Sequence, residues 1–317
     1  LMFHRVCPES SRPRIRGNSG LEVTPEYLEN TIKFLRKNNY EIVSLSRVAK
    51  ILNDNYKKKK FAVLTFDDGY IDNYVHAYPI FKKHRVPFSI YVTTNFPDGN
   101  AILWWYILED LILKETRIEF QLNGLEYQYS CASLWQKEWA YQQIHGLILN
   151  GPSNDLNQRI RQVSKNYDID FIKKTSELAL TWEQIREMSA DPLVEIGAHT
   201  INHHALSKLI DSDVQKEMEG SRDKIESEIN QKVEHFSYPF GTRNEAGQRE
   251  FKIAKKCGFK TSTTTSIANI FKEHKDLLEQ LPRIPVNQKR DNGKINYLNL
   301  WLNGTLPCII NKFKKIL

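Results

Sequence analysis

Short apolar runs alternate along this chain with stretches in which apolar residues recur at helical spacing. Runs with the length of a buried strand occur at 1–6, 41–45, 61–66, 87–92, 193–198, 233–238, 259–265 and 281–286. Helices are expected between them, at 24–37, 46–52, 73–84, 181–189, 212–231 and 244–257. In the first helix, Leu28, Ile32 and Leu35 share one face after a Thr24-Pro25 start signal. Strands that alternate with helices favour a parallel sheet in an α/β fold.

The alternation stops between residues 96 and 180, which we interpret as an inserted cap subdomain within a single domain of residues 1–317. Helical spacing predicts one helix over 104–112 and a second over 133–149. Between them, alternating residues flank Asn123-Gly124, the pair typical of a type I′ hairpin turn. The stretch 150–170 is polar, and no element is predicted there.

Composition restricts the class of protein but does not select one function. The chain has 317 residues, of which 40% are hydrophobic, enough for one large α/β barrel or two ordinary domains. Its four cysteines are far apart and form no CxxC pair, which argues against a zinc ribbon and a disulfide-rich scaffold. The net charge is +7, and a basic surface could favour an anionic polymer, a lipid-linked glycan or a membrane face. The run Lys57–Lys60 is interpreted as a solvated loop.

The sequence shows no signal peptide and no apolar stretch of membrane-spanning length, so we expect a cytoplasmic protein. The basic, amphipathic tail at 309–317 could touch an anionic membrane, although packing on the barrel is the favoured interpretation. No nucleic-acid partner is expected, and the oligomeric state stays open.

Polar side chains follow two of the predicted strands. Asp67 and Asp68 end one apolar run, and His199 and His203 follow another. Parallel α/β folds place their active sites at this edge of the sheet. Two imidazoles and one carboxylate are zinc-type ligands, and the second carboxylate is then free to act as a base. A spacing of four puts the histidines on one face of a helical turn. Alone, Asp-Asp-Gly is also a common turn sequence.

A third segment, Ser-Tyr-Pro-Phe-Gly at 237–241, also ends a strand. Its proline and glycine predict an unusual turn that exposes the Phe240 N–H to a bound oxyanion. Thr-Phe-Asp-Asp-Gly, His-x-x-x-His and Tyr-Pro-Phe-Gly, in this order, resemble the NodB-type polysaccharide deacetylases of carbohydrate esterase family 4. The segments 3–6, 24–26 and 40–45 resemble the branch that deacetylates poly-N-acetylglucosamine and surface glycans.

This resemblance implies a distorted (β/α)₇ barrel and hydrolysis of the N-acetyl group of an amino sugar in a surface polysaccharide or its precursor. It implies that Asp68, His199 and His203 bind a divalent metal, usually Zn²⁺. Asp67 then matches the general base, and Phe240 matches the residue whose backbone N–H binds the oxyanion. Two alternatives stay open: a metal-dependent amidase acting on a non-sugar amide, and a non-catalytic carbohydrate-binding protein of the same fold.

The family often has a C-terminal arginine that orients the catalytic carboxylate, and Arg283 matches it; a surface ion pair is the equal alternative. The chain departs from the family pattern at Ser237, where many members have arginine, and Arg243 is the nearest replacement. No histidine follows His274, so the late motif that supplies the general acid is absent. His4 is the best remaining polar candidate near the metal, with a histidine bonded in the barrel rim as the alternative.

Aromatic residues are concentrated in the cap. Sugars stack on aromatic faces, so the cap could line a glycan groove, but we favour a role in the cap's own core or in a dimer contact. Four of the six tryptophans lie there: Trp104, Trp105, Trp135 and Trp139.

Overall fold

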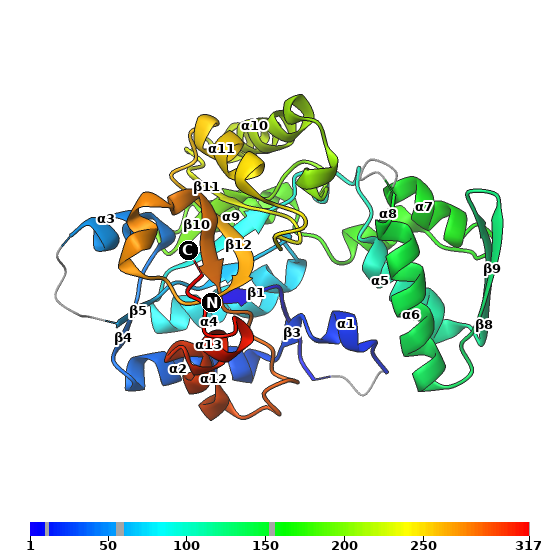
Figure 1. The fold of residues 1–317 in the computed structure, drawn as a ribbon, viewed down its shortest axis with the longest axis horizontal. Helices are drawn as coiled ribbons and strands as arrows, with labels where there is room; N and C mark the ends of the chain where they lie inside the picture. The colour runs from blue at the N-terminus through cyan, green and yellow to red at the C-terminus, as the bar shows by residue number, and fades with distance from the viewer. Residues whose placement is uncertain (10–12, 55–59, 152–155, 317) are drawn as a thin grey trace.

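The computed structural model describes residues 1–9, 13–54, 60–151 and 156–316, and its centre is a seven-stranded parallel barrel (Figure 1). In sheet order its strands are β1 (Met2–Phe3), β6 (Thr65–Phe66), β7 (Phe88–Val92), β10 (Val194–Ala198), β11 (His235–Ser237), β12 (Thr261–Ile267) and β13 (Leu281–Arg283). The Met2 N–H donates to the Ile284 carbonyl, and the Val286 N–H donates to the Met2 carbonyl, at 2.9 Å each. These bonds join the first strand to the chain after the last strand and so close the barrel.

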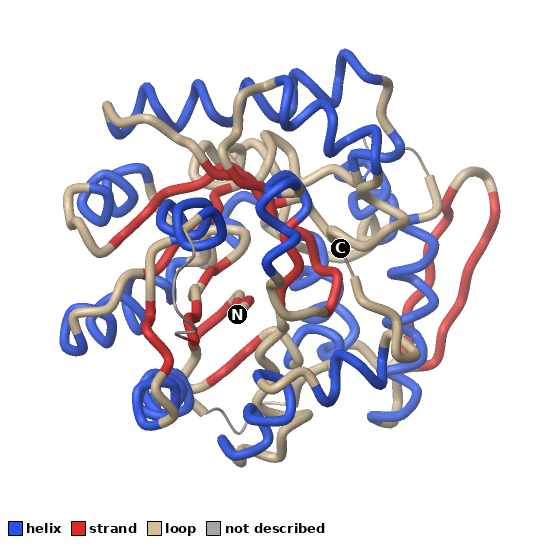
Figure 2. The backbone as a smooth tube through the Cα atoms, turned by 60° about the vertical axis from the view of Figure 1, so that its left-hand side comes forward, coloured by secondary structure: helices blue, strands red, loops and turns tan. Residues whose placement is uncertain are grey.

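Helices cover the outside of the barrel, as the view in Figure 2 shows. They are α2 (Pro25–Lys37), α3 (Val48–Asn53), α4 (Tyr78–His84), α9 (Trp182–Ser189), α10 (Asp211–Ile229) and α11 (Gln248–Lys256). Local sequence sets their starts: the Thr24 hydroxyl accepts from the Tyr27 N–H at α2, and Thr181 and Gln184 form a capping box at α9. The predicted face of α2 is buried as expected.

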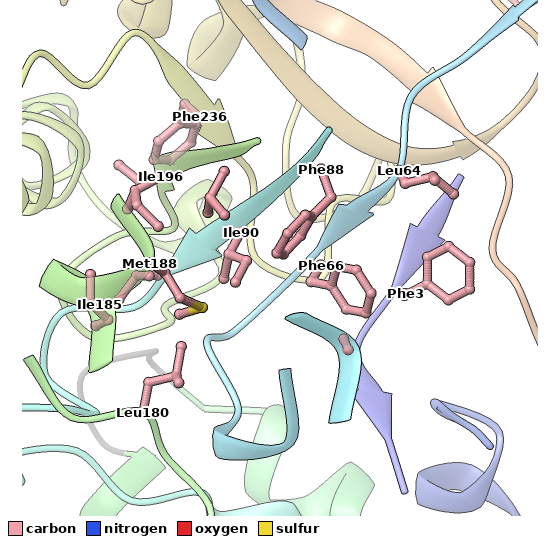
Figure 3. Close-up of a cluster of buried hydrophobic side chains, with 14 of the residues drawn as sticks. Phe3, Leu64, Phe66, Phe88, Ile90, Leu180, Ile185, Met188, Ile196 and Phe236 are labelled. Atoms are coloured by element: carbon pink, nitrogen blue, oxygen red, sulfur yellow. The ribbon is translucent and has the colours of Figure 1, made fainter. Parts of the chain in front are cut away.

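Apolar side chains, both aliphatic and aromatic, fill the space between the sheet and this helical layer (Figure 3). The Phe66 ring lies 5.2 Å from Phe3, 5.8 Å from Phe81 and 5.9 Å from Phe88, measured between centroids. All four side chains are fully buried. Phe66 directly precedes the acidic pair, so this packing holds the end of β6 in place.

Smaller elements surround the barrel. Two short parallel pairs flank it, β2 (Arg5–Val6) with β3 (Glu22–Val23) and β4 (Tyr40–Ile42) with β5 (Lys60–Ala62). The short helices are α1 (Arg16–Ser19), α12 (Leu298–Leu302) and α13 (Thr305–Ile310). In the tail, Ile309, Ile310 and Phe313 are exposed; its contact with a membrane stays a prediction. The described residues contain no helix long and apolar enough to cross a membrane.

Residues 96–180 lie to one side of the barrel, at the right of Figure 1. They form α5 (Trp104–Lys114), β8 (Arg117–Leu122), β9 (Leu125–Ser130), α6 (Leu134–Leu149), α7 (Leu156–Val163) and α8 (Phe171–Ser176). These elements share a buried apolar cluster of their own. The hairpin turns at Asn123 and Gly124, both with positive φ, as the sequence predicts. The helices α7 and α8 were not predicted.

The N-terminal segment is bound to this insertion through Glu109 of α5. The buried Glu109 carboxylate accepts hydrogen bonds from the Arg14 guanidinium, the Ile15 N–H and the Asn18 amide at 2.8 to 3.0 Å. Three donors compensate the burial of this charge. These bonds hold the N-terminal segment against α5 of the insertion.

Several predicted boundaries were wrong. The first apolar run is broken at His4, between β1 and β2, and the run 61–66 is divided between β5 and β6. The helix expected over 244–257 begins only at Gln248. The strand expected over 281–286 ends at Arg283, and a bridge at Pro285 continues the pairing. The predicted loop at Lys57–Lys60 lies largely outside the described residues.

Candidate active site

Asp67 and Asp68 lie in the turn at the carboxyl end of β6. The backbone enters the left-handed region at Asp68 (φ 75°) and Gly69 (φ 79°). Because of this turn, both adjacent carboxylates line the same cavity, although on a continuous strand they would point to opposite faces. Both are buried, at 2% and 4% exposure. A left-handed aspartate is uncommon, and such backbone is concentrated at functional sites.

The Asp68 carboxylate faces two imidazoles. Its Oδ1 lies 3.3 Å from His199 Nε2 and 3.2 Å from His203 Nε2. Among the described residues Asp68 Oδ1 has no hydrogen-bond partner. The two imidazole nitrogens therefore approach it without forming hydrogen bonds to it. Ligand atoms that each lie about 2.1 Å from a tetrahedral cation are about 3.4 Å apart. The distances from Asp68 Oδ1 to the two imidazole nitrogens therefore fit a Zn²⁺-type ion. The three side chains thus fit a divalent metal.

The electrostatics of this group also suit a cation. Burial raises the pKa of the Asp68 carboxyl, but the neighbouring His203 and His199 rings hold it well below its ordinary value. His199 Nδ1 donates to the Ser237 carbonyl at 2.7 Å, so Nε2 is the ring nitrogen that faces Asp68. Ionised carboxylate and neutral imidazole are the forms that bind metals.

The two histidines lie on a loop after β10 and not on a helical turn, so the prediction of a shared helix face was wrong. Thr200 (φ 68°) and His203 (φ 57°) are both left-handed, and the Thr200 hydroxyl accepts from the His203 N–H at 2.9 Å. The buried Glu217 of α10 accepts from the Ile201 and Asn202 N–H groups, also at 2.9 Å. These bonds turn the loop so that both rings reach Asp68.

Asp67 is bonded to Arg283 from β13. Arg283 Nη1 donates to Asp67 Oδ1 at 2.6 Å, and Nη2 donates to Oδ2 at 2.7 Å. Burial raises the pKa of Asp67, but Arg283 outweighs it and lowers that pKa below the ordinary value. Asp67 is therefore an ionised carboxylate in a fixed orientation. Of the two readings of Arg283, the surface ion pair is wrong, because both partners are buried.

Ser237, where many family members have arginine, contacts an arginine from another strand. Arg283 donates to the Ser237 hydroxyl at 2.9 Å, to the Thr65 hydroxyl at 3.1 Å and to the Thr264 carbonyl at 2.9 Å. Ser237 thus accepts from the arginine that binds Asp67. Arg243, the replacement considered from the sequence, is exposed and is not part of this network.

Phe240 lines the site beside His203. Its backbone is left-handed (φ 59°), its ring lies 4.9 Å from the His203 ring, and its carbonyl accepts from the Thr265 hydroxyl at 2.6 Å. At Gly241 (φ 56°) a Cβ would lie 2.8 Å from Thr265 N, so the turn requires glycine. In the described part of the chain, the Phe240 N–H has no backbone acceptor.

These groups open into a cavity of about 490 Å³, within the range of small-ligand sites. The barrel contributes Met2, His4, Asp67, Asp68, His199, His203, Phe240 and Thr265, and the N-terminal segment contributes Gly17, Asn18 and Leu21. The insertion contributes Trp104, Trp105, Glu138, Tyr141, Gln142 and His145. Sequence reasoning considered the aromatic residues of the insertion as a groove lining but missed its polar residues Glu138, Gln142 and His145; their three- and four-residue spacing is the signal that could have found them.

Trp105 connects the insertion to the three candidate metal ligands. Its ring lies 5.1 Å from the His203 ring, and its Nε1 donates to the Tyr70 hydroxyl at 3.1 Å. Trp104 lies 4.9 Å from the His145 ring. Both tryptophans are buried, whereas Trp135 and Trp139 are exposed, so the four predicted together have two different environments.

Comparison with known proteins gives the family of the chain. The family model described as polysaccharide deacetylase matches residues 54–262. YxkH of Bacillus subtilis, provisionally named a polysaccharide deacetylase, is 24% identical over 266 residues, which are 84% of this chain and 63% of that protein. The chain thus spans less than two thirds of this curated relative.

Two solved structures have the same fold. The Streptococcus pyogenes deacetylase PplD has a TM-score of 0.61 and 20% identity, over 95% of this chain and 96% of that one. IcaB from Ammonifex degensii has a TM-score of 0.57 and 17% identity, over 95% and 94%. With a closed seven-stranded barrel and a family match over most of its length, the chain belongs to the polysaccharide deacetylase family, of the NodB type (carbohydrate esterase family 4).

Proposed function

We propose that this protein is a metal-dependent N-deacetylase that releases acetate from an amino sugar in a surface polysaccharide or its precursor. The observation that carries the proposal is the convergence of Asp68, His199 and His203 beside an ionised Asp67 held by Arg283. A protein that only binds carbohydrate needs no base next to a metal-ligand set. Membership of the polysaccharide deacetylase family supports the same reaction.

Each residue has a role in this proposal. A divalent cation, which we propose to be Zn²⁺, would polarise the acetamide carbonyl and make water more acidic when bound. Asp67 accepts the proton of the attacking water, and Arg283 keeps its carboxylate ionised and oriented. The Phe240 N–H donates to the oxyanion of the tetrahedral intermediate, a contact whose loss typically costs on the order of 100-fold in rate.

We propose His4 as the acid that protonates the leaving amine. It lines the cavity with Asp67 and Asp68. Burial lowers the pKa of His4, but these two carboxylates oppose that shift. His145 faces the same cavity, yet burial alone lowers its pKa to about 4, so it is neutral near pH 7. The pKa of His4 is also lowered overall, and we prefer His4 because Asp68 and Asp67 act on it electrostatically whereas neither acts on His145.

Acetate release tests this function. The Zn²⁺-loaded protein is incubated with N-acetylglucosamine oligomers and with bacterial surface-glycan extracts, beside Asp67→Asn and His199→Ala. Arg243→Ala, an exposed change outside the site, is the matched control. We expect release by the parent and the control only. Stoichiometric metal without release from any glycan would contradict the proposal and favour a non-sugar amide or a binding role. His4→Gln and His145→Gln then test the acid: only the first should lose kcat.

A further inference from the structure

One face of α6 runs from the catalytic cavity to the protein surface. Trp135, Glu138, Gln142 and His145 recur at intervals of three and four residues, so they form one stripe along the helix. The last three line the cavity that also contains the acidic pair. Trp135 is one turn earlier, outside the cavity. The stripe extends about 15 Å along the helix axis, at 1.5 Å per residue.

The outer end of this stripe is an exposed aromatic surface. Trp135 is 73% exposed and Trp139, one turn further along and beside the stripe, is 45% exposed. The Trp139 ring is supported from behind by Tyr129 of β9, at 5.5 Å between centroids. Large aromatic side chains left in solvent are uncommon unless they bind something.

The inner end of the stripe offers polar groups that are available to a ligand. Among the described residues, neither the Gln142 amide nor the His145 ring has a hydrogen-bond partner. Glu138 Oε1 accepts from the Arg16 N–H at 2.8 Å, which fixes the side chain at the cavity rim. An amide and a neutral imidazole can both donate to and accept from sugar hydroxyls.

We propose that this face of α6 is a glycan-binding track continuous with the catalytic cavity, in which Gln142 and His145 contact the reacting sugar and Trp135 and Trp139 stack on the next sugars. The proposal rests on the proposed function, because its occupant is the remainder of the same glycan. Its length fits a short oligosaccharide and exceeds a single sugar. The substrate is accordingly an oligosaccharide or polymer, and a monosaccharide derivative is a poor one.

The test compares binding and turnover as a function of glycan length. Titration calorimetry with Asp67→Asn, which should bind without turnover, uses N-acetylglucosamine and its linear oligomers up to the pentamer. We expect Trp135→Ala in this background to raise the dissociation constant of the pentamer about 3- to 10-fold, the range for one aromatic contact, and to leave that of the monosaccharide unchanged. Trp135→Phe should recover most of the affinity. Leu125→Ala, also exposed on the insertion, is the control.

Turnover separates this proposal from the function on which it rests. In the active protein, Trp135→Ala should raise KM for the pentamer without lowering kcat. Acetate release with equal affinity for all lengths, unchanged by Trp135→Ala, would overturn the track and leave the deacetylase intact. A dimer that Trp135→Ala converts to monomers, with glycan binding unchanged, would assign this face to self-association and also overturn it. No binding of any oligomer, together with no acetate release from any glycan, would overturn both proposals.

Discussion

Arg283 and Asp67 form a bidentate, buried ion pair across 216 positions of the sequence, with each guanidinium nitrogen on its own carboxylate oxygen. The arginine comes from the last barrel strand and the aspartate from the end of the second strand in the sheet order. Barrel closure brings them together. The orientation of the proposed base therefore depends on the whole barrel.

Replacing Arg283 with Gln should damage both stability and activity. It leaves the Asp67 carboxylate buried without its counter-charge, which typically costs about 3 kcal/mol or more of unfolding free energy. The loss of the fixed orientation should lower kcat on the order of 100-fold. Urea denaturation and acetate release measure the two effects.

The double variant Asp67→Asn/Arg283→Gln is the control for this pair. With the charge removed from both partners, its destabilisation should be smaller than the sum of the two single changes. Additive effects would show that the ion pair is not the cause.

Metal binding should depend on three side chains and not on their neighbour. We expect the chelator-treated parent to bind Zn²⁺ and to gain about 4 kcal/mol of stability at a free concentration 1,000 times the dissociation constant. Asp68→Ala and His203→Ala should lose this gain. His204→Ala is the matched control, because His204 faces Glu217 at 3.6 Å and lies outside the ligand group. Thermal unfolding with and without metal measures the stability gained on adding Zn²⁺. An equal gain in all variants would contradict the assignment of these residues as metal ligands.

His145 should make the protein sensitive to acid. Burial lowers its pKa from 6.5 to about 4, so the unfolded chain binds more protons than the folded chain between these values. The contribution of His145 to the free energy of unfolding is therefore fully present above pH 6.5. It falls by about 1 to 3 kcal/mol as the pH decreases toward 4. His145→Gln should remove this part of the pH dependence when unfolding is followed at several pH values. An unchanged profile would show that His145 does not titrate in this window.

Two glycines should respond oppositely to alanine. At Gly197 on β10 a Cβ would lie 2.5 Å from the Tyr91 ring and 3.1 Å from the His235 carbonyl, both in the packed barrel. Gly197→Ala should destabilise the fold by about 1 to 3 kcal/mol. At Gly146 on α6 nothing lies within 4 Å, so Gly146→Ala should stabilise by about 0.5 to 1 kcal/mol. Denaturant titration of both variants checks the signs.

The convergence of the candidate residues could be expected from the sequence because the barrel delivers polar groups where apolar runs end. Asp67, Asp68 and His199 all directly follow such runs. What the sequence could not show is backbone direction. A spacing of four suits a helix, but left-handed residues at Thr200 and His203 achieve the same convergence in a loop.

The role of Arg283 also needed the structure. The sequence allowed a surface ion pair and a residue that orients the carboxylate equally, and barrel closure places Arg283 against the buried Asp67. The helix α7 is a different case, because its signal was present: Leu156, Ile160 and Val163 recur at helical spacing and are buried. The polar residues around them concealed it.

Glu109 fastens the N-terminal segment to the insertion, and both contribute residues to the cavity that also contains the acidic pair and the histidines of the barrel. The surface that meets a substrate and the groups proposed to cleave it are thus encoded in separate stretches of the chain. Under our proposals, substitutions within 96–180 can change which glycan the protein accepts and leave the reaction itself unchanged. Transplanting that stretch between relatives is accordingly a direct route to redirecting such an enzyme.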